Sequence, residues 1–379
     1  MIIKNGFLYH NNSFDVCDIR ITDKIITEIG KNLEPEENEL VLLKDQQYVL
    51  PGFIDIHTHG AVNVDVNDAS VEGLKQISAF FASHGTTSWL CSILTDTEEK
   101  TLACIDTVVE YMSQERIGAQ LLGIHLEGPF LSDEYRGSMP QHLLQDTFHL
   151  SLLQKYQERA KGLIRYITIA PEIQYSIEAI DAIHQLGIKV AIGHSGADYE
   201  TAMNAIKHGA DASTHTMNAM RLIHQHEPAI TGAILESDIY SEMICDGLHL
   251  HPGIVRLLYK VKGNQRLLAI TDSIMAAGLS DGEYHLGVNA ITVTDGDAKV
   301  SGTNIRAGST LTLDRALRNV LSFINQPLER IVPIFSTNQA SLLGLNKGHI
   351  QVGYDADLVI LDRNYQVTST IVSGKVVYD

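Results

Sequence analysis

Side chains that can bind a divalent cation close several short apolar segments of this 379-residue chain. They are His57 and His59, His125 and Glu127, His194, His215, Asp246 and His249, and Asp272. Neutral imidazoles together with carboxylates suit Zn²⁺ or Fe²⁺, whereas Mg²⁺ and Ca²⁺ take mostly oxygen ligands. These residue types therefore predict a metal site for zinc or iron.

A histidine at one such position is weak support, because most strand-terminal histidines are structural. The chain has 17 histidines, and the H-x-H pattern occurs at His57/His59, His224/His226 and His249/His251. The pattern alone is therefore unspecific. The stronger signal is that four histidines, one glutamate and one aspartate all fall where predicted strands end.

Asp272 also has the properties of a proton acceptor. A carboxylate beside a metal site can take a proton from an attacking water and then pass it to a leaving group. Alternatively, Asp272 is a further ligand, or it accepts a hydrogen bond from a ligand histidine. These roles are compatible with one another.

The elements that must position these residues follow a regular alternation. Eight apolar segments closed by polar residues alternate with amphipathic segments, which predicts an α/β fold, a parallel (β/α)₈ barrel of the TIM type. A doubly wound sheet is disfavoured, because no glycine-rich phosphate-binding motif follows a predicted strand. The eight segments are 48–59, 86–94, 119–127, 164–172, 188–195, 211–216, 240–249 and 266–273. In such barrels the site lies at the C-terminal ends of the strands, so the polar residues are expected at one rim.

The two ends of the chain are predicted to meet outside the barrel. Residues 1–50 and 345–379 have strand character and are expected to form a small β-sandwich domain, with the barrel over 51–344. An Asp295-Gly296 turn between β-branched residues predicts a hairpin after the eighth strand. A T-x-x-E capping box at Thr95 and Glu98 predicts the start of a helix.

Composition excludes several classes of protein. With 28 Lys+Arg against 46 Asp+Glu the net charge is −18, which argues against a nucleic-acid-binding protein. No apolar run approaches the roughly 20 residues that span a bilayer, and the start lacks the pattern of a secretory signal. The four cysteines show no CxxC or disulfide-framework spacing, which is typical of a reducing compartment. Together these features lead us to expect a cytoplasmic protein without membrane attachment.

Longer motifs carry a family resemblance. PGFIDIHTHG (51–60) resembles the first-strand motif of the amidohydrolase superfamily. Further segments, in the same order along nearly the whole chain, resemble the N-acetylglucosamine-6-phosphate deacetylase family in particular. They are HLEGPFL (125–131), GHSGA (193–197), STHTMNAM (213–220), DGLHLHP (246–252), ITDSIMAAG (270–278), AGSTLTLDRALRN (307–319) and the closing segment 348–362.

The resemblance implies roles for individual residues. Glu127, His194 and His215 match the family's principal metal site, and His57 and His59 match the pair that some members use for a second metal, bridged by Glu127. One or two zinc or iron ions per subunit are therefore implied, and Asp272 is implied as the catalytic acid/base. Asn218, Ala219, His249, Ala307 and Gly308 match positions that hold the sugar phosphate in the family. Further candidates for substrate binding in this chain are Ser138, Met139, His226 and Arg306. A homodimer, with the loop after the sixth strand reaching into the partner's site, is also implied.

Two positions depart from the family pattern. The usual phosphate-binding arginine is His226 here, and a frequent substrate-contacting histidine is Met139. Histidine offers one directed donor and only partial charge near neutral pH, whereas arginine offers a bidentate fork. Arg306, in a short apparent insertion, is a candidate to restore the charge, and His142 or Gln141 is a candidate to replace the lost contact.

The expected function is metal-dependent deacetylation of N-acetyl-D-glucosamine 6-phosphate. Three alternatives stay open at this point. The first is a deacetylase of another N-acyl amino sugar, such as N-acetylgalactosamine 6-phosphate or an unphosphorylated sugar. The second is a cyclic-amide or dipeptide hydrolase, disfavoured because the fourth strand closes in Ala170-Pro171-Glu172 without a lysine. The third is a non-catalytic barrel scaffold, although no ligand is missing.

Overall fold

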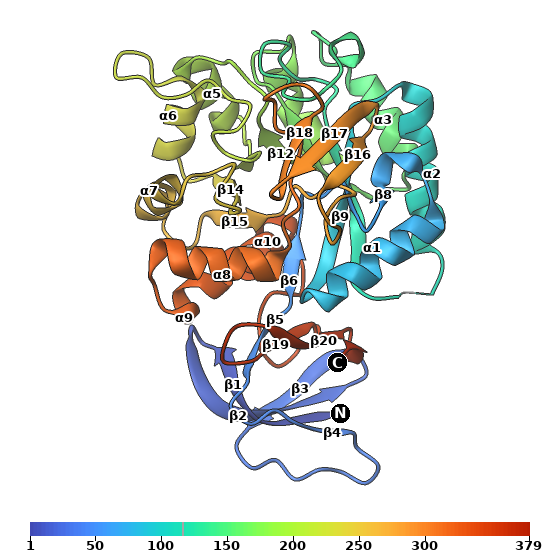
Figure 1. Cartoon of the computed structure of the whole chain (residues 1–379), viewed down its shortest axis with the longest axis vertical. Coiled ribbons are helices and arrows are strands. Elements are labelled where there is room, and N and C mark those ends of the chain that lie inside the picture. The colour runs from blue at the N-terminus through green and yellow to red at the C-terminus, as the bar shows by residue number, and fades with distance from the viewer. Residues whose placement is uncertain (116) are drawn as a thin grey trace.

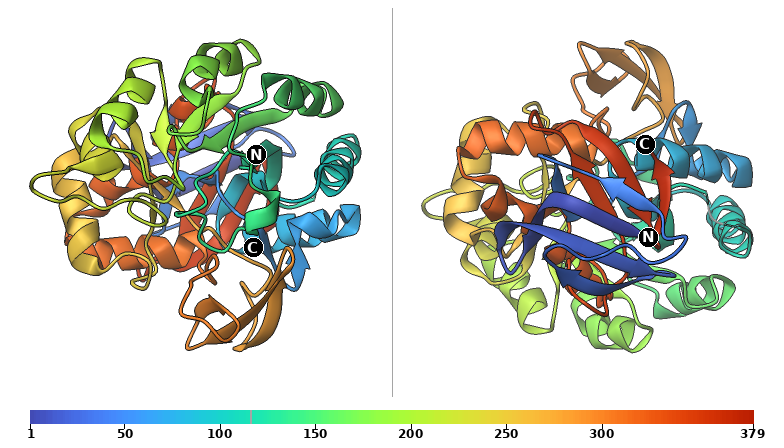
Figure 2. Two further views of the ribbon diagram at one scale, coloured as in Figure 1. Left: turned by 90° about the horizontal axis from the view of Figure 1, so that it is seen from above. Right: turned by 90° about the horizontal axis from the view of Figure 1, so that it is seen from below.

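A computed structural model describes residues 1–115 and 117–379. Its centre is an eight-stranded parallel sheet that curves into a nearly closed barrel (Figures 1 and 2), and its strands lie in the eight predicted segments. In chain order they are β6 (Phe53–Asp55), β9 (Thr86–Leu94), β10 (Gln120–Glu127), β11 (Ile164–Ile169), β12 (Lys189–Ile192), β13 (Ala212–Ser213), β14 (Tyr240–Ile244) and β15 (Leu267–Ile270). The predicted fold class is confirmed.

The ring of strands closes just beyond the C-terminal ends of β6 and β15. The Asp272 N–H donates to the His57 carbonyl at 2.9 Å, and the His59 N–H donates to the Ser273 carbonyl at 2.8 Å. The first and the last strand of the barrel are thus joined at the rim where the polar residues gather. This closure fixes the backbone of Asp272 beside the H-x-H pair.

Helices form the outer layer of the barrel, as the view from above shows (Figure 2). They are α1 (Val71–Ser83), α2 (Glu98–Met112), α3 (Leu150–Arg159), α4 (Ser176–Gln185), α5 (Tyr199–Lys207), α6 (Ala229–Glu236), α7 (Pro252–Lys262), α8 (Leu313–Ile324), α9 (Leu328–Ile331) and α10 (Thr337–Leu343). Shorter elements are the strands β7 (Gly60–Ala61) and β8 (Val64–Asp65) and the 3₁₀ turns η1 (Val66–Asp68), η2 (Gln141–Leu143) and η3 (Val332–Phe335). No helix within 1–115 and 117–379 is long and apolar enough to cross a bilayer.

The start of α2 corrects one prediction. The residue that caps this helix is Thr97, whose hydroxyl accepts a hydrogen bond from the Lys100 N–H, and not Thr95. The Thr95 hydroxyl instead donates to the Glu127 carbonyl at 2.9 Å. A hydroxyl two residues closer to the helix takes the capping position, and Thr95 supports the end of β10.

Both ends of the chain contribute to one further sheet below the barrel (Figure 1). Its strands are β1 (Ile2–His10), β2 (Ser13–Thr22), β3 (Ile25–Gly30), β4 (Val41–Leu43), β5 (Tyr48–Pro51), β19 (Leu358–Leu361), β20 (Val367–Val372) and β21 (Lys375–Tyr378). The Ile26 N–H donates to the Tyr354 carbonyl, and the Ala356 N–H to the Lys24 carbonyl. The edge strand β3 therefore lies against the segment that enters β19, and this one sheet curls around its own apolar core.

A small antiparallel sheet lies beside the rim of the barrel (Figure 1). It consists of β16 (Gly282–Leu286), β17 (Asn289–Thr294) and β18 (Asp297–Val300). The predicted hairpin is present, because Asp295 and Gly296 form its turn with φ of 51° and 75°. The turn pattern does not predict β16, which extends the hairpin to three strands.

Candidate active site

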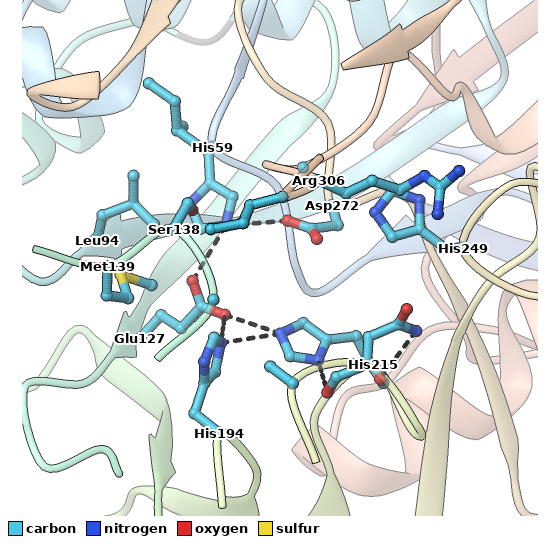
Figure 3. A pocket seen from close by; sticks show the side chains of 16 residues that line it. His59, Leu94, Glu127, Ser138, Met139, His194, His215, His249, Asp272 and Arg306 are labelled. Atoms are coloured by element: carbon cyan, nitrogen blue, oxygen red, sulfur yellow. Dashed lines mark hydrogen bonds and ion pairs between the residues drawn. The ribbon is translucent and has the colours of Figure 1, made fainter. Parts of the chain in front are cut away.

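Glu127, at the end of β10, is at the centre of a cluster of four imidazoles (Figure 3 shows three of them). Its Oε1 lies 3.1 Å from His194 Nε2, 3.2 Å from His215 Nε2 and 3.3 Å from His57 Nε2. Its Oε2 lies 3.3 Å from His59 Nε2. One carboxylate thus faces ring nitrogens from segments that follow β6, β12 and β13.

The other nitrogen of each of these rings contacts a hydrogen-bond acceptor. An acceptor at Nδ1 requires the proton there, so the lone pair of each Nε2 points into the cluster. His57 Nδ1 lies 3.0 Å from the Glu242 carboxylate, and His59 Nδ1 lies 2.9 Å from the Ser92 carbonyl. His194 Nδ1 lies 3.0 Å from the Tyr135 carbonyl, and His215 Nδ1 lies 3.2 Å from the Asn218 carbonyl.

The cluster has the chemistry of a cation site. His57 Nε2 and His59 Nε2 are 3.2 Å apart, and His194 Nε2 and His215 Nε2 are 3.0 Å apart. Two unprotonated nitrogens at this distance have no hydrogen between them, so a shared cation is what satisfies them. The donor set fits zinc or iron. The ligand atoms form two groups, each within 4.8 Å, which are His57/His59/Asp272 and Glu127/His194/His215.

Asp272 lies directly beside this cluster, immediately after β15. Its Oδ1 is 3.1 Å from His59 Nε2 and 3.7 Å from His57 Nε2. Burial raises the pKa of Asp272, but without a cation the ring of His59 can carry a second proton, and its hydrogen bond together with the charge of His57 then holds that pKa below its usual value. The carboxylate is therefore ionised at neutral pH and can accept a proton.

The pKa of Glu127 is held well below its usual value in the same way. Burial raises this pKa, but in the absence of a cation, when ring nitrogens of the cluster carry protons, the charge of His57 and the hydrogen bonds from His194 and His215 lower it more strongly. Three residues of the cluster also have left-handed backbone, with φ of 47° at His194, 25° at His215 and 49° at Asp272. Such conformations are costly for residues with a Cβ and are typical of functional sites.

Two residues near the cluster do not follow the strand-end pattern. Glu242, inside β14, accepts from His57 Nδ1, although it interrupts an apolar segment and does not close it. Conversely, His125 lies in β10 two residues before Glu127 and belongs to neither group of ligand atoms. Its two ring nitrogens contact Ser92 Oγ and Thr168 Oγ1, both at 2.9 Å.

A pocket of about 210 Å³ opens above the cluster (Figure 3). Three of the residues proposed from the sequence as principal metal ligands or substrate contacts are not part of its lining. His57 is fully buried among the ligands, Ala307 is buried beside Gly308, and His226 lies in an exposed loop. The lining comprises His59, Leu94, Glu127, Gly137, Ser138, Met139, His194, His215, Asn218, Ala219, His249, Asp272, Leu286, Ile305, Arg306 and Gly308.

One side of the pocket is polar and cationic. The Arg306 guanidinium is held by Asp297 through Nε at 2.8 Å and Nη2 at 3.1 Å. This hydrogen bonding raises the pKa of Arg306, with a further contribution from the charge of Asp246. Asp246 also accepts from His249 Nδ1 at 2.7 Å, so the side chains of Arg306 and His249 are both held in fixed orientations.

The opposite side of the pocket is apolar. Leu94 and Met139 lie there (Figure 3), and together with Leu286, which also lines the pocket, they belong to one buried apolar cluster with residues of the strands β17 and β18. Met139 is 5% exposed, so its side chain presents a packed wall and no hydrogen-bond donor to the pocket. Within the described part of the chain, neither His142 nor Gln141 is among the lining residues.

Comparison with known proteins agrees with the barrel fold. The profile of the amidohydrolase family matches residues 48–377, which is most of the chain. The protein therefore belongs to the amidohydrolase family, as the sequence motifs predicted.

Similar proteins define its place within that family. The chain is 35% identical to N-acetylglucosamine-6-phosphate deacetylase of Lysinibacillus sphaericus, covering 99% of this chain and 97% of that protein. It is 36% identical to the Bacillus subtilis deacetylase of the same name, covering 100% and 94%. The structure of a substituted Mycobacterium smegmatis N-acetyl-D-glucosamine-6-phosphate deacetylase, in complex with N-acetyl-D-glucosamine-6-phosphate, superposes with a TM-score of 0.94 at 30% identity, covering 100% and 99%. The family of N-acetylglucosamine-6-phosphate deacetylases, predicted from the motifs, is thus confirmed.

Proposed function

We propose that this protein is a metal-dependent deacetylase that hydrolyses N-acetyl-D-glucosamine 6-phosphate to D-glucosamine 6-phosphate and acetate. The observation that carries the proposal is the cluster of four Nε2 atoms around Glu127, with the ionised Asp272 next to it. Full-length similarity to deacetylases of this name, one of them in complex with the sugar phosphate, supports the choice of substrate.

In the proposed reaction Asp272 moves the protons. A divalent cation supplies Lewis-acid chemistry in such a site, because it polarises a carbonyl and makes water more acidic. Asp272 accepts a proton from the attacking water and returns it to the sugar nitrogen as the C–N bond breaks. Amines are poor leaving groups, so the second transfer is as necessary as the first.

The metal site itself is part of the proposal. Glu127, His194 and His215 would hold one cation, and His57 and His59 would hold a second together with Asp272 or Glu127. Zinc or iron is supported by the imidazole-rich donor set. Elemental analysis of protein purified without chelators measures both the identity and the number of the ions.

We further propose that the phosphate of the substrate lies against Asn218, His249 and Arg306. A fixed guanidinium offers charged donors to phosphate oxygens, and the ring of His249 and the amide of Asn218 offer further hydrogen-bond donors. Because position 226 carries no arginine and His226 is outside the pocket of its own chain, Arg306 supplies the main positive charge. The remaining candidate positions in the pocket lining would contact the sugar ring, and they are Ser138, Met139, Ala219 and Gly308. Ala307 is buried next to Gly308 in the chain and would support it.

A homodimer in the cytoplasm completes the proposal. The loop after β13 exposes Leu222 at 58% and Ile223 at 55%, and apolar side chains exposed together are typical of contact surfaces. In a dimer this loop, with His226, would reach the pocket of the second copy. The four cysteines are all free and buried, which suits a reducing compartment.

The decisive experiment is acetate release from a panel of N-acetylhexosamines. Wild-type protein is expected to prefer N-acetyl-D-glucosamine 6-phosphate over its galactosamine isomer and over both unphosphorylated sugars in kcat/KM. A preference for a free sugar would replace the proposed substrate by the alternative that the His226 and Met139 departures suggest. No release from any of them would leave the scaffold interpretation.

A hydrolase of cyclic amides or dipeptides has less support. The segment after β11 carries Glu172 and no lysine at the barrel rim. Glu172 accepts hydrogen bonds from Ser195 Oγ and the Gly196 N–H, both at 2.6 Å, and so stabilises the loop after β12. A carboxylated lysine bridging two metals therefore has no counterpart at this position.

A further inference from the structure

Glu242 is a carboxylate buried inside the barrel, on the third residue of β14, and it is 0% exposed. Its Oε2 accepts from His57 Nδ1 at 3.0 Å and from the His215 N–H at 2.9 Å. Its Oε1 accepts from the Tyr166 hydroxyl at 2.8 Å. Within 1–115 and 117–379 no lysine or arginine forms an ion pair with this carboxylate.

A carboxylate in this position is costly for folding, because burying a charge away from water is unfavourable unless it is paired or hydrogen-bonded. The three donors satisfy it, but an apolar residue of similar size would need none of them. Glu242 therefore requires an explanation beyond the stability of the barrel. Its contacts supply one, because two of its three donors belong to residues of the cluster.

The contact with His57 decides which ring nitrogen of this histidine carries the proton. A carboxylate at Nδ1 holds the proton there, so Nε2 presents its lone pair toward His59 and Glu127. The other three imidazoles of the cluster are oriented by backbone carbonyls. His57 alone among these four is oriented by a charged side chain.

The contact with His215 holds the backbone of the second group. The His215 N–H donates to the same oxygen, Oε2, that accepts from His57. His215 has a φ of 25°, a conformation that needs support from its surroundings. One oxygen of Glu242 thus contacts a member of each group of ligand atoms.

We infer that Glu242 is a positioning residue that makes the His57/His59/Asp272 group a cation site by fixing the ring of His57. The inference rests on the proposed metal-dependent function. The charge on Glu242 strengthens the donor Nε2 through the ring, and its removal weakens the cation held by this group. Tyr166 supports the carboxylate through its other oxygen, Oε1.

The test is cation binding by metal-free protein. Binding is measured by calorimetry and by the visible absorption of Co²⁺. Glu242→Gln keeps the shape, because its amide oxygen can accept from His57 and His215 while its NH₂ group faces the Tyr166 oxygen. We expect a loss of roughly 10- to 100-fold in affinity for one cation, which is the range for residues behind metal ligands. Circular dichroism checks that the barrel is retained.

Asp55→Asn is the matched control. Asp55 is a carboxylate in β6 that is 1% exposed and accepts from the His57 N–H at 3.3 Å and from Thr271 Oγ1 at 2.6 Å, so it bonds the backbone of His57 and not the ring. If Glu242 acted only by holding strands together, both variants would lose cation affinity to the same extent. An equal loss, or a loss below about tenfold in Glu242→Gln, overturns the inference.

A double-variant cycle assigns the effect to the right group. In a His59→Ala background the His57/His59/Asp272 group is already broken, so adding Glu242→Gln should have little further effect on cation binding. A full additional loss in that background would contradict the proposed route through His57. These measurements contain no substrate, so acetate release tests the proposed function separately.

Discussion

The two carboxylates of the site have different surroundings, and these predict different roles. Both oxygens of Glu127 face imidazole nitrogens, whereas Asp272 contacts them through Oδ1. Glu127 is 2% exposed and Asp272 is 7% exposed, so Asp272 has the greater access to the pocket. A carboxylate enclosed by ligands suits cation binding, and one at the pocket surface suits proton transfer.

Asp272→Asn should therefore separate catalysis from metal binding. An amide cannot take a proton from water, so we expect kcat to fall by about 10³-fold, within the range for general acid–base groups. Elemental analysis of the same preparation should find the metal of the Glu127/His194/His215 group retained. A rate within about tenfold of the wild type would contradict the proton-transfer role.

Arg306→Gln should change the preference between substrates. A hydrogen bond to a charged group contributes about 1.5–3 kcal/mol, which corresponds to roughly 10- to 100-fold in kcat/KM. This loss is expected for the phosphorylated sugar, while kcat/KM for the unphosphorylated sugar should stay unchanged. The measurement is the ratio of the two values in each variant.

Arg256→Gln serves as the control for that ratio. Arg256 is on α7, donates to the Phe323 carbonyl and is not among the pocket lining. Its replacement removes the same net charge without touching the pocket. If Arg306→Gln lowered kcat/KM equally for both sugars, Arg306 would not recognise the phosphate. The same conclusion would follow if Arg256→Gln changed the ratio of the two kcat/KM values as much as Arg306→Gln does.

At the scale of elements, the barrel rim was predictable because each strand and the polar residue that closes it are neighbours in sequence. What could not be predicted are contacts made by backbone. The carbonyls of Ser92, Tyr135 and Asn218 orient three of the imidazoles, and any residue type can supply a carbonyl. The sequence therefore indicates the candidate ligands more readily than the backbone atoms that orient them.

Position within a strand explains why His125 and Glu242 depart from the strand-end pattern. His125 and Glu127 point to the same face of β10, because side chains two residues apart share a face, but His125 lies one layer deeper. Glu242 likewise lies inside β14 and not at its end. A search limited to strand ends includes the first residue wrongly and misses the second.

The junction of α1 and α8 provides a pH-dependent contribution to stability. Asp314, in the first turn of α8, accepts from His84 Nδ1 at 3.0 Å and from Arg318 Nη2 at 3.0 Å. Burial raises the pKa of Asp314, but these partners lower it to about 2. Because this pKa is lower in the folded than in the unfolded chain, the stabilisation is present above about pH 4 and is lost as the pH falls toward about 2.

Asp314→Asn should remove that contribution. We expect a decrease of about 2 kcal/mol in the free energy of unfolding at about pH 7, measured by denaturant titration. The difference between variant and wild type should shrink as the pH is lowered from about 4 toward about 2. A difference that stays constant over this range would mean that the ionised carboxylate is not what stabilises the junction.

At the scale of the whole molecule, the cluster links cation binding to stability. The lone pairs of four imidazoles converge only in the folded chain, so a cation binds the native state far better than the unfolded one. At a concentration roughly 1,000 times its Kd, a cation adds about 4 kcal/mol to stability. For a chain of this length that corresponds to roughly 5 °C in Tm.

Chelation should therefore lower Tm by roughly that amount, measured by calorimetry before and after dialysis against a chelator, and re-addition of Zn²⁺ should restore it. His194→Ala is the control, because it lacks one ligand and should respond less. An unchanged Tm in the wild type would contradict a cation site in the folded protein.

The proposed homodimer predicts that the loop between β13 and α6 contacts a second copy of the chain. Residues 222–227 are exposed and lie outside the chain's own apolar clusters, with Leu222 at 58% and Ile223 at 55% exposure. Replacing both by serine should convert a dimer of 41.7 kDa chains to monomers in light scattering, because the variant lacks the apolar contact.

Leu43→Ser is the control for this change in mass. It alters a side chain that is 64% exposed on β4, in the sheet formed by both ends of the chain and far from the loop in sequence, and it should leave the mass unchanged. If the loop also completes the pocket of the second copy, kcat/KM falls as the dimer dissociates, because His226 then no longer reaches a substrate. A wild-type protein that is monomeric and fully active would show instead that one chain contains the whole site.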